Sequence, residues 1–151
     1  METQFQWQHV DHGSPDWEAV VELRREVLRR PLGLDFSPEE LQSETEQIVV
    51  AGFDGDRAVA CALIKPLPNG WHKVRQVAVD PSRQGTGLGR KVMEECERYS
   101  LAAGAIGIEM NARDTAIPFY LRLAYLIDGE GFEEVGIPHH RMIKRLGTNP
   151  A

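Results

Sequence analysis

The feature that most constrains the fold is a glycine-rich segment at residues 83–90, which reads Arg-Gln-Gly-Thr-Gly-Leu-Gly-Arg. It follows the β-prone run Val74–Val79, which Asp80-Pro81 stops, and it precedes apolar residues at helical spacing. At such a strand-to-helix junction the first N–H groups of the helix have no intrahelical partner, and the helix dipole favours an anion. The segment therefore predicts a loop whose backbone can approach a phosphate closely.

Two common nucleotide-binding patterns do not match this loop. The dinucleotide fingerprint GxGxxG fails because its third glycine would have to stand at Arg90 or Val92. The P-loop fails because no Gly-Lys-Ser/Thr sequence follows the glycines. A turn that merely tightens a strand-to-helix connection remains the alternative to anion binding.

Hydrophobic periodicity predicts strands and helices along the rest of the chain. Ser14-Pro15-Asp16 is typical of a helix N-terminus, and Ser37-Pro38-Glu39-Glu40 is typical of a capping box. Strands are expected at residues 5–10, 48–53, 58–64, 74–79, 105–110, 125–128 and 137–145. Helices are expected from Ser14 to Pro31, over a short stretch from Ser37, from Leu88 to Gly104, and from Asp114 or Thr115 to about Leu123.

The order βααβββαβαββ favours an α/β (α+β) layer fold, with a central mixed, twisted sheet of about seven strands flanked by about four helices. A chain of 151 residues lies near the commonest size of one domain. We therefore expect a single domain over residues 1–146, followed by a flexible tail at residues 147–151.

Composition argues against several classes of function. The net charge of −6 disfavours a protein built to bind nucleic acid, although residues 71–151 carry a net charge of +1 and residues 1–70 a net charge of −7. Cys61 and Cys96 lie in apolar segments without ligand spacing, which predicts buried free thiols and no metal. No apolar run is long enough to cross a bilayer, and no basic leader precedes one, so we expect a cytoplasmic protein without a membrane partner.

The glycine loop resembles the pyrophosphate loop of the GCN5-related N-acetyltransferase (GNAT) family. That family's Gln/Arg-x-x-Gly-x-Gly/Ala pattern is matched by Gln84, Gly87 and Gly89, and the predicted elements follow the family's order across nearly the entire chain. The resemblance implies a GNAT-like fold, with acetyl-CoA as the cofactor. The coenzyme-binding residues that it implies are Val77, Ala78 and Val79, by their backbone, and Arg83, Gln84, Gly85, Thr86, Gly87, Leu88, Gly89 and Arg90.

The segment Phe119–Tyr125 resembles the family's Phe-Tyr-x-x-Leu-Gly-Phe, which implies that Tyr120 donates a proton to the departing thiolate. A phenol of pKa about 10 stays protonated at neutral pH and can donate to a thiolate whose thiol has a pKa of about 8.5. Ala124-Tyr125 departs from the family's Gly-Phe, and Thr115 stands where asparagine is common. Without the motif, a buried aromatic at helical spacing would be read as core.

The segment Gly129–Met142 looks like the Gly-Glu-x-Phe and Pro-His-x-x-Met ending of the glyphosate N-acetyltransferase branch. The resemblance makes His139 the general base, and His140, the next residue on a strand, would point to the other face. It also places Arg29, Arg75 and Arg113 where that branch binds the acidic groups of its substrate. Guanidinium groups suit such oxyanions.

The expected function is transfer of an acetyl group from acetyl-CoA to a primary or secondary amine, by direct transfer in a ternary complex. The expected partner is a small amino-acid-like amine with an acidic group, bound by a monomer or homodimer. The alternatives are a non-catalytic acyl-CoA-binding regulatory module, and an acetyltransferase acting on a polyamine, a protein amine or charged tRNA. Glu109 is the alternative base, through a water relay. The acceptor amine, the acyl-chain preference and the oligomeric state stay open.

Overall fold

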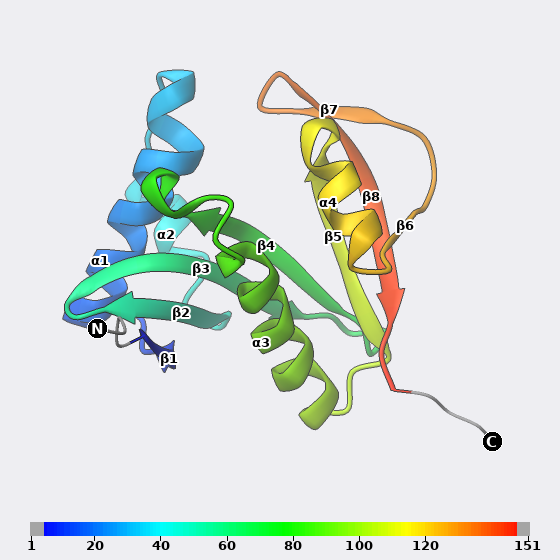
Figure 1. Cartoon of the computed structure of the whole chain (residues 1–151), viewed down its shortest axis with the longest axis horizontal. Coiled ribbons are helices and arrows are strands. Elements are labelled where there is room, and N and C mark those ends of the chain that lie inside the picture. The colour runs from blue at the N-terminus through cyan, green and yellow to red at the C-terminus, as the bar shows by residue number, and fades with distance from the viewer. Residues whose placement is uncertain (1–4, 148–151) are drawn as a thin grey trace. The chain divides into compact units, whose positions relative to one another are not determined.

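A computed structural model describes residues 5–147 of the protein (Figure 1). Its strands are β1 (Phe5–Val10), β2 (Ile48–Asp54), β3 (Arg57–Pro66), β4 (His72–Val79), β5 (Gly107–Arg113), β6 (Leu126–Ile127), β7 (Phe132–Glu134) and β8 (Ile137–Arg145). Its α-helices are α1 (Pro15–Arg24), α2 (Pro38–Gln42), α3 (Leu88–Ala102) and α4 (Ile117–Arg122). Shorter turns are the π turn η1 (Arg25–Arg29) and the 3-10 turns η2 (Arg30–Leu32), η3 (Pro81–Arg83) and η4 (Asp114–Ala116).

Helix α1 begins where the sequence predicts, because the Ser14 hydroxyl accepts a hydrogen bond from the Trp17 N–H at 3.1 Å. Its α-helical pairing ends at Arg24, earlier than predicted, and the chain continues through η1 and then η2, which contains Pro31. Such π turns often occur at functional sites. This one ends at Arg29, a predicted substrate-binding residue.

The chain forms two compact units, Met1–Lys65 with Gln76–Cys96, and Pro66–Arg75 with Glu97–Ala151. The chain passes from one unit to the other at the end of β3, within β4 and within α3. Each unit is therefore built from two separate segments. Val77–Val79 and the glycine loop belong to the first unit, whereas Tyr120 and His139 belong to the second.

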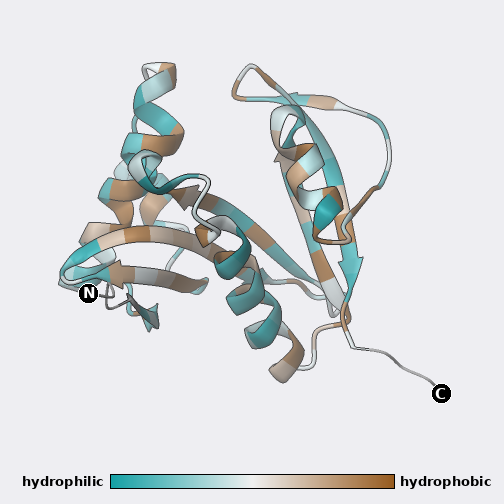
Figure 2. Cartoon of the chain, viewed as in Figure 1, coloured by the Kyte–Doolittle hydropathy of each residue, from teal (hydrophilic) through white to brown (hydrophobic). Residues whose placement is uncertain are grey.

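In the first unit, β1, β2 and β3 pair antiparallel, with Trp7 opposite Gly52 and Ala51 opposite Cys61. Gly52 is needed because a Cβ there would lie 2.9 Å from the Trp7 ring. Figure 2 shows how largely hydrophobic β3 is. Its side chains pack with those of α1 into a core of Val10, Trp17, Val20, Val21, Leu23, Val49, Ala51, Phe53, Ala58, Cys61, Leu63 and Ala78.

In the second unit, β8 is the central strand. It pairs antiparallel with β5 along seven residue pairs, from Gly107 opposite Arg145 to Arg113 opposite His139. The short strands β6 and β7 also pair with β8. The first residues of β4 pair in parallel with β5, at His72 with Ile108 and at Lys73 with Glu109.

The strand order β1-β2-β3-β4-β5-β8-β6, with β7 on β8, confirms the predicted mixed sheet flanked by four α-helices. The prediction missed β7, whose three residues are all exposed and carry no alternating pattern. The predicted cap of the last helix is also wrong. No side chain caps η4 or α4, because the carboxylate of Asp114 contacts the ring of His140 instead.

Domain boundaries stay a prediction. The single domain over residues 1–146 includes both compact units, and most of the expected tail at residues 147–151 lies outside the described residues.

Candidate active site

The glycine loop is anchored at its start by Asp80, which ends β4. One carboxylate oxygen accepts hydrogen bonds from the Ser82 N–H and hydroxyl, each at 2.9 Å, and the other accepts one from Arg57 at 2.6 Å. Burial alone would raise the pKa of Asp80, but the hydrogen bonds from Ser82 and Arg57 outweigh it and hold that pKa below its ordinary value. Asp80 therefore stays ionised and fixes the direction in which the loop leaves the strand.

Two glycines give the loop its shape. Gly85 and Gly87 have φ angles of 81° and 89°, in the left-handed region that residues with a Cβ avoid. A Cβ at either position would meet no atom within 4 Å, so the backbone conformation, not lack of space, requires glycine. Both residues are exposed, and helix α3 starts directly after them at Leu88. The loop can therefore present backbone N–H groups to an external ligand.

The other loop residues divide into structural contacts and exposed charge. Arg83 donates to Asp54 at 2.5 Å, and the Gln84 amide lies 3.4 Å from the carbonyl oxygen of Val79. The Thr86 hydroxyl donates to the carbonyl oxygen of Arg83. Arg90 is exposed and lies 3.5 Å from Glu94, one helical turn further on. An exposed loop with two left-handed glycines, an arginine and a helix N-terminus fits a pyrophosphate group.

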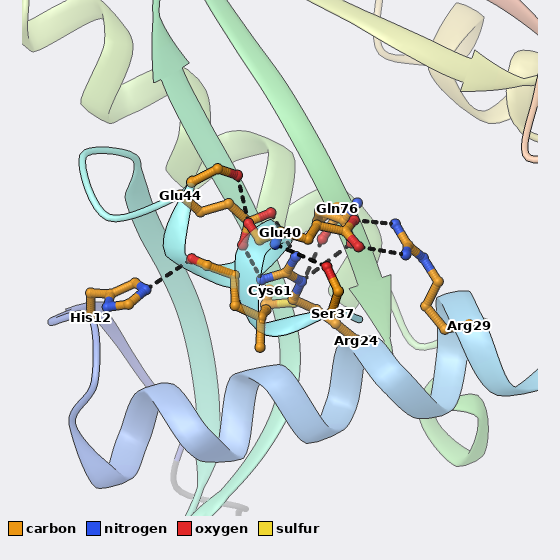
Figure 3. A network of polar contacts seen from close by, with 10 residues as sticks. His12, Arg24, Arg29, Ser37, Glu40, Glu44, Cys61 and Gln76 are labelled. Atoms are coloured by element: carbon orange, nitrogen blue, oxygen red, sulfur yellow. Dashed lines mark hydrogen bonds and ion pairs between the residues drawn. The ribbon is translucent and has the colours of Figure 1, made fainter. Parts of the chain in front are cut away.

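A buried polar network lies beside β4 in the first unit, and the sequence analysis missed it (Figure 3). The side chains of Arg24 and Glu44 are 0% and 2% exposed and form two parallel hydrogen bonds of 3.0 and 2.9 Å. Arg24 also donates to the side-chain oxygen of Gln76 at 3.2 Å. Gln76 has a φ angle of 56° and directly precedes Val77–Val79. In the sequence, only the run of arginines between Arg24 and Arg30, which begins at the last residue of α1, could have drawn attention to this site.

Both cysteines are buried free thiols, as predicted. Burial raises the pKa of Cys61 to about 12, although the nearby Arg24 charge acts in the opposite direction. Cys61 stays a thiol at neutral pH and is unsuited to accept an acyl group as a thiolate.

In the second unit, Tyr120 lies on α4 and is 7% exposed. Its ring meets those of Phe119 and Tyr125 edge to face, with centroids 5.0 and 5.8 Å away. The Tyr125 hydroxyl donates to Glu97 of α3 at 2.8 Å, so this departure from the family motif links α3 to the segment that follows α4. Ala124, which replaces the family's glycine, has a φ angle of 74° and carries the strain that glycine would avoid.

His139 lies on β8 and is 4% exposed. Its Nδ1 atom is 2.7 Å from the carbonyl oxygen of Ile137, its Nε2 atom is 3.7 Å from a carboxylate oxygen of Glu134, and its ring stacks on Phe132. Because a carbonyl can only accept, Nδ1 carries a proton and donates it to the carbonyl oxygen of Ile137. In the neutral ring, the lone pair would therefore lie on Nε2, the nitrogen nearer to Glu134.

His140 faces the other way, as the sequence predicts for the next residue on a strand. Its Nδ1 atom is 2.7 Å from the Asp114 carboxylate. Its ring also lies against Gly131, where an added Cβ would come within 2.8 Å of it. The contacts of His140 join β8 to η4 and to the segment before β7.

The predicted substrate arginines are divided between the two compact units. Arg113 is the register partner of His139 across β5 and β8, and opposite residues on neighbouring strands share a face. Arg75 lies on β4 in the same unit. Arg29 belongs to the first unit, where Glu40 accepts from it at 2.8 and 3.2 Å and the Phe36 ring lies 4.2 Å away. Glu109, the alternative base, accepts from Arg141 at 3.1 Å.

Comparison with known proteins identifies the family. Residues 17–125 match the model of the Acetyltransferase (GNAT) family. The uncharacterized N-acetyltransferase YjcF of Bacillus subtilis (strain 168) is 34% identical over 107 residues, which are 70% of this chain and 74% of that protein. The chain belongs to the GNAT acetyltransferase family.

Solved structures confirm the GNAT-like fold. An acyl-CoA N-acyltransferase from Pseudomonas aeruginosa superposes with a TM-score of 0.81 at 18% identity, covering 93% of this chain and 99% of that one. An aminoglycoside 6'-N-acetyltransferase complexed with coenzyme A also gives a TM-score of 0.81 at 18% identity, covering 97% and 99%. The predicted enzyme class and cofactor are confirmed with the family: this GNAT protein is an N-acetyltransferase that uses acetyl-CoA.

Among residues 5–147 of this GNAT enzyme, no group of three or more His, Cys, Asp or Glu side chains could hold a metal ion. Within the same residues, no helix is long and apolar enough to span a membrane.

Glu134 is the residue near His139 that the sequence analysis missed. It lies at the end of β7, accepts a hydrogen bond from the Asn111 amide at 3.2 Å and approaches His139 with its other oxygen. The sequence offers little indication of a role for Glu134, because Glu133 and Glu134 are adjacent acidic residues in a polar segment, which is typical of an exposed loop.

Proposed function

We propose that this GNAT enzyme transfers the acetyl group of acetyl-CoA to a primary or secondary amine of a small, amino-acid-like molecule with an acidic group. The observation that carries this proposal is the pairing of His139 with Arg113 on neighbouring strands. His139 would accept the proton of the substrate amine, and Arg113, on the same face of the sheet, would bind the acidic group.

The coenzyme would be held by the loop at residues 83–90. The left-handed conformations of Gly85 and Gly87 support this role, as does the exposed start of α3. Bound acetyl-CoA supplies a thioester whose carbonyl carbon an amine can attack. A backbone N–H within Val77–Val79 would donate to the oxygen on which negative charge develops. Ala78 is buried and Val77 and Val79 are half-buried, which supports the expectation that their side chains pack and that only the backbone acts.

Tyr120 is the proposed acid. Its burial against Phe119 and Tyr125 fixes the ring, and a phenol can give a proton to the departing thiolate at neutral pH. Direct transfer is supported by Cys61, whose pKa of about 12 leaves it without a thiolate to carry the acetyl group. Replacement of Tyr120 by Phe should leave acetyl-CoA binding unchanged and lower kcat about tenfold to a hundredfold. An unchanged kcat would remove Tyr120 from the mechanism.

His139 is the proposed base. An alkylammonium of pKa about 10.4 must lose a proton before the amine can attack, and the Nε2 lone pair of His139 is the acceptor. The Glu134 carboxylate, 3.7 Å away, would stabilise the imidazolium that results. Glu109 is the weaker candidate because its carboxylate already accepts from Arg141.

The acidic group of the substrate would be bound by Arg113 and Arg75, with Arg29 as a third contact. Arg113 has the strongest support because of its position opposite His139. Arg29 has the weakest, since Glu40 and Phe36 already contact its guanidinium. The likeness to the glyphosate N-acetyltransferase branch rests on these arginines and on His139. We also propose that the enzyme acts in the cytoplasm as a monomer or homodimer, and its two free thiols are consistent with a reducing compartment.

The test combines calorimetry with acetyl-CoA and an assay of thiol release on a panel of amines. The panel contains amino acids, aminophosphonates, polyamines and a lysine peptide. Release that requires an acidic amine supports the proposal. Release with polyamines or the peptide alone would overturn the substrate class and leave the enzyme class intact. Binding of acetyl-CoA without release from any amine would favour the regulatory module.

A further inference from the structure

The backbone of β4 is strained at Gln76, immediately before the residues that would meet the thioester. A φ angle of 56° is unfavourable for any residue with a Cβ, and it persists only where the surroundings hold it. Gln76 is also part of a strand, where such an angle interrupts the regular pleat. Some contact must therefore hold this residue in place.

Contacts on both sides of Gln76 supply that restraint (Figure 3). Its side-chain oxygen accepts a hydrogen bond from Nε of Arg24 at 3.2 Å. Its carbonyl oxygen lies 3.7 Å from the Sγ atom of Cys61 on β3, which acts as a weak donor. The side chain and the backbone of Gln76 are thus held by two different elements of the first unit.

Arg24 is itself locked in position. Glu44 accepts from both terminal nitrogens of Arg24, and the Phe36 ring lies 4.5 Å from the centre of the guanidinium. Both charged groups are buried, and a buried ion pair is a poor means of adding stability, because apolar residues of similar volume often serve equally well. A guanidinium held this firmly provides a fixed hydrogen-bond direction, which an apolar side chain lacks.

We infer that Arg24, locked by Glu44, positions the left-handed residue Gln76 and thereby aims the backbone N–H groups of Val77–Val79 at the thioester carbonyl. Arg24 and Gln76 are positioning residues in this scheme and touch no reacting atom. The inference rests on the proposed function, because it explains how the β4 backbone reaches the geometry that acetyl transfer requires. It makes the rate of transfer, rather than the affinity for acetyl-CoA, depend on Gln76.

The test uses three substitutions of Gln76 that separate the hydrogen bond from the strain. Gln76→Leu removes the acceptor and keeps the bulk, and we expect kcat to fall about tenfold while the Kd of acetyl-CoA stays within twofold. Gln76→Glu keeps an acceptor for Arg24 and should recover most of that loss. Gln76→Gly removes the acceptor and makes the left-handed conformation favourable, so its kcat should lie between the other two.

Two other variants test whether kcat falls because the protein is less stable rather than because Gln76 is no longer positioned. The double variant Arg24→Met with Glu44→Leu removes the whole ion pair, so no charge is left unpaired in the core, and its kcat should fall as in Gln76→Leu. Arg25→Leu is the matched control, because the neighbouring Arg25 forms ion pairs with Glu22 and Asp35 at the surface. Its kcat should remain that of the unchanged enzyme.

A direct readout is the carbonyl stretch of bound acetyl-CoA labelled with carbon-13, measured by infrared difference spectroscopy. Donation to the carbonyl lowers its frequency, so Gln76→Leu should lose most of the lowering seen in the unchanged enzyme, and Gln76→Glu should retain it. An equal kcat in all three Gln76 variants would overturn the inference. The inference would also be overturned if the carbonyl frequency of bound acetyl-CoA were not lowered in the unchanged enzyme. The use of acetyl-CoA as coenzyme would still hold in that case. No binding at all would overturn the proposed function as well.

Discussion

The Nδ1 atom of His139 lies 2.7 Å from the carbonyl oxygen of Ile137, two residues earlier on the same strand. This hydrogen bond decides which ring nitrogen carries the proton, and so leaves Nε2 as the basic atom. The contact is local, because both residues belong to β8. The strand thus sets the tautomer before any substrate binds.

Replacing His139 by Gln should lower kcat/KM for the amine by about a hundredfold to ten-thousandfold, the usual range for loss of a general base. The affinity for acetyl-CoA should not change. His140→Gln is the matched control, because its ring contacts Asp114 and faces away, and it should keep most of the activity. Steady-state kinetics at several pH values measure both. Equal losses in the two variants would count against His139 as the base.

Gly87→Ala should weaken acetyl-CoA binding about tenfold and destabilise the protein by about 1–2 kcal/mol, because alanine at a φ angle of 89° strains the backbone. Gly104→Ala is the control. Gly104 follows α3, has a φ angle of 83° and, like Gly87, has no atom within 4 Å of an added Cβ. It should cost similar stability and leave the Kd unchanged. Calorimetry and urea unfolding separate the two effects, and a normal Kd in Gly87→Ala would make the loop structural.

Ala124→Gly should raise the free energy of unfolding by about 0.5–1 kcal/mol, because glycine adopts a φ angle of 74° without strain. Urea unfolding measures the change. Ala112→Gly provides the opposite case, because Ala112 is buried near the end of β5 and has no positive φ angle, and this change should destabilise the protein by about 0.5–1 kcal/mol. A loss of stability in Ala124→Gly would show that its Cβ makes contacts that outweigh the strain.

Asp80→Asn should destabilise the protein by about 1.5–3 kcal/mol at neutral pH, because Asp80 accepts charge-assisted hydrogen bonds from Ser82 and Arg57. The pKa of Asp80 is lower in the folded protein than in the unfolded chain. Its stabilisation is therefore present above the unfolded pKa of about 3.9 and is lost as the pH falls through the lower folded pKa.

The measurement is urea unfolding of the Asp80→Asn variant and the unchanged protein between pH 3 and 7. The two curves should converge toward the acid end of that range. Glu94→Gln, which alters an exposed pair with Arg90, should change stability by less than about 1 kcal/mol at every pH. A difference for Asp80→Asn that is independent of pH would mean that its charge is unimportant.

Local patterns in the sequence predict most of the fold, and they fail where distant residues decide. The cap at Ser14 and the glycine loop follow from neighbouring residues, and the structure has both. Asp114 looks like a helix cap, but its partner is His140, 26 positions away. The pairing of Arg24 with Glu44 and Gln76 likewise joins three separate segments. No periodicity reveals such a contact.

The candidate site divides in the same way. The tautomer of His139 depends on a residue two positions away, whereas the approach of Glu134 depends on β7, which has no recognisable strand pattern. The motif also led to an arginine, Arg29, that the structure pairs with Glu40 in the first unit. A motif specifies which residues occur, and the fold decides which partners they meet.

The most direct test of the central claim measures acetyl transfer to an amino acid and to its uncharged amide, with the unchanged enzyme and with Arg113→Met. We predict that the unchanged enzyme prefers the acid at least tenfold in kcat/KM, and that Arg113→Met loses most of this preference while keeping its affinity for acetyl-CoA. An equal preference in both enzymes, or a preference for the amide in the unchanged enzyme, would contradict the claim that this GNAT enzyme selects amines with an acidic group.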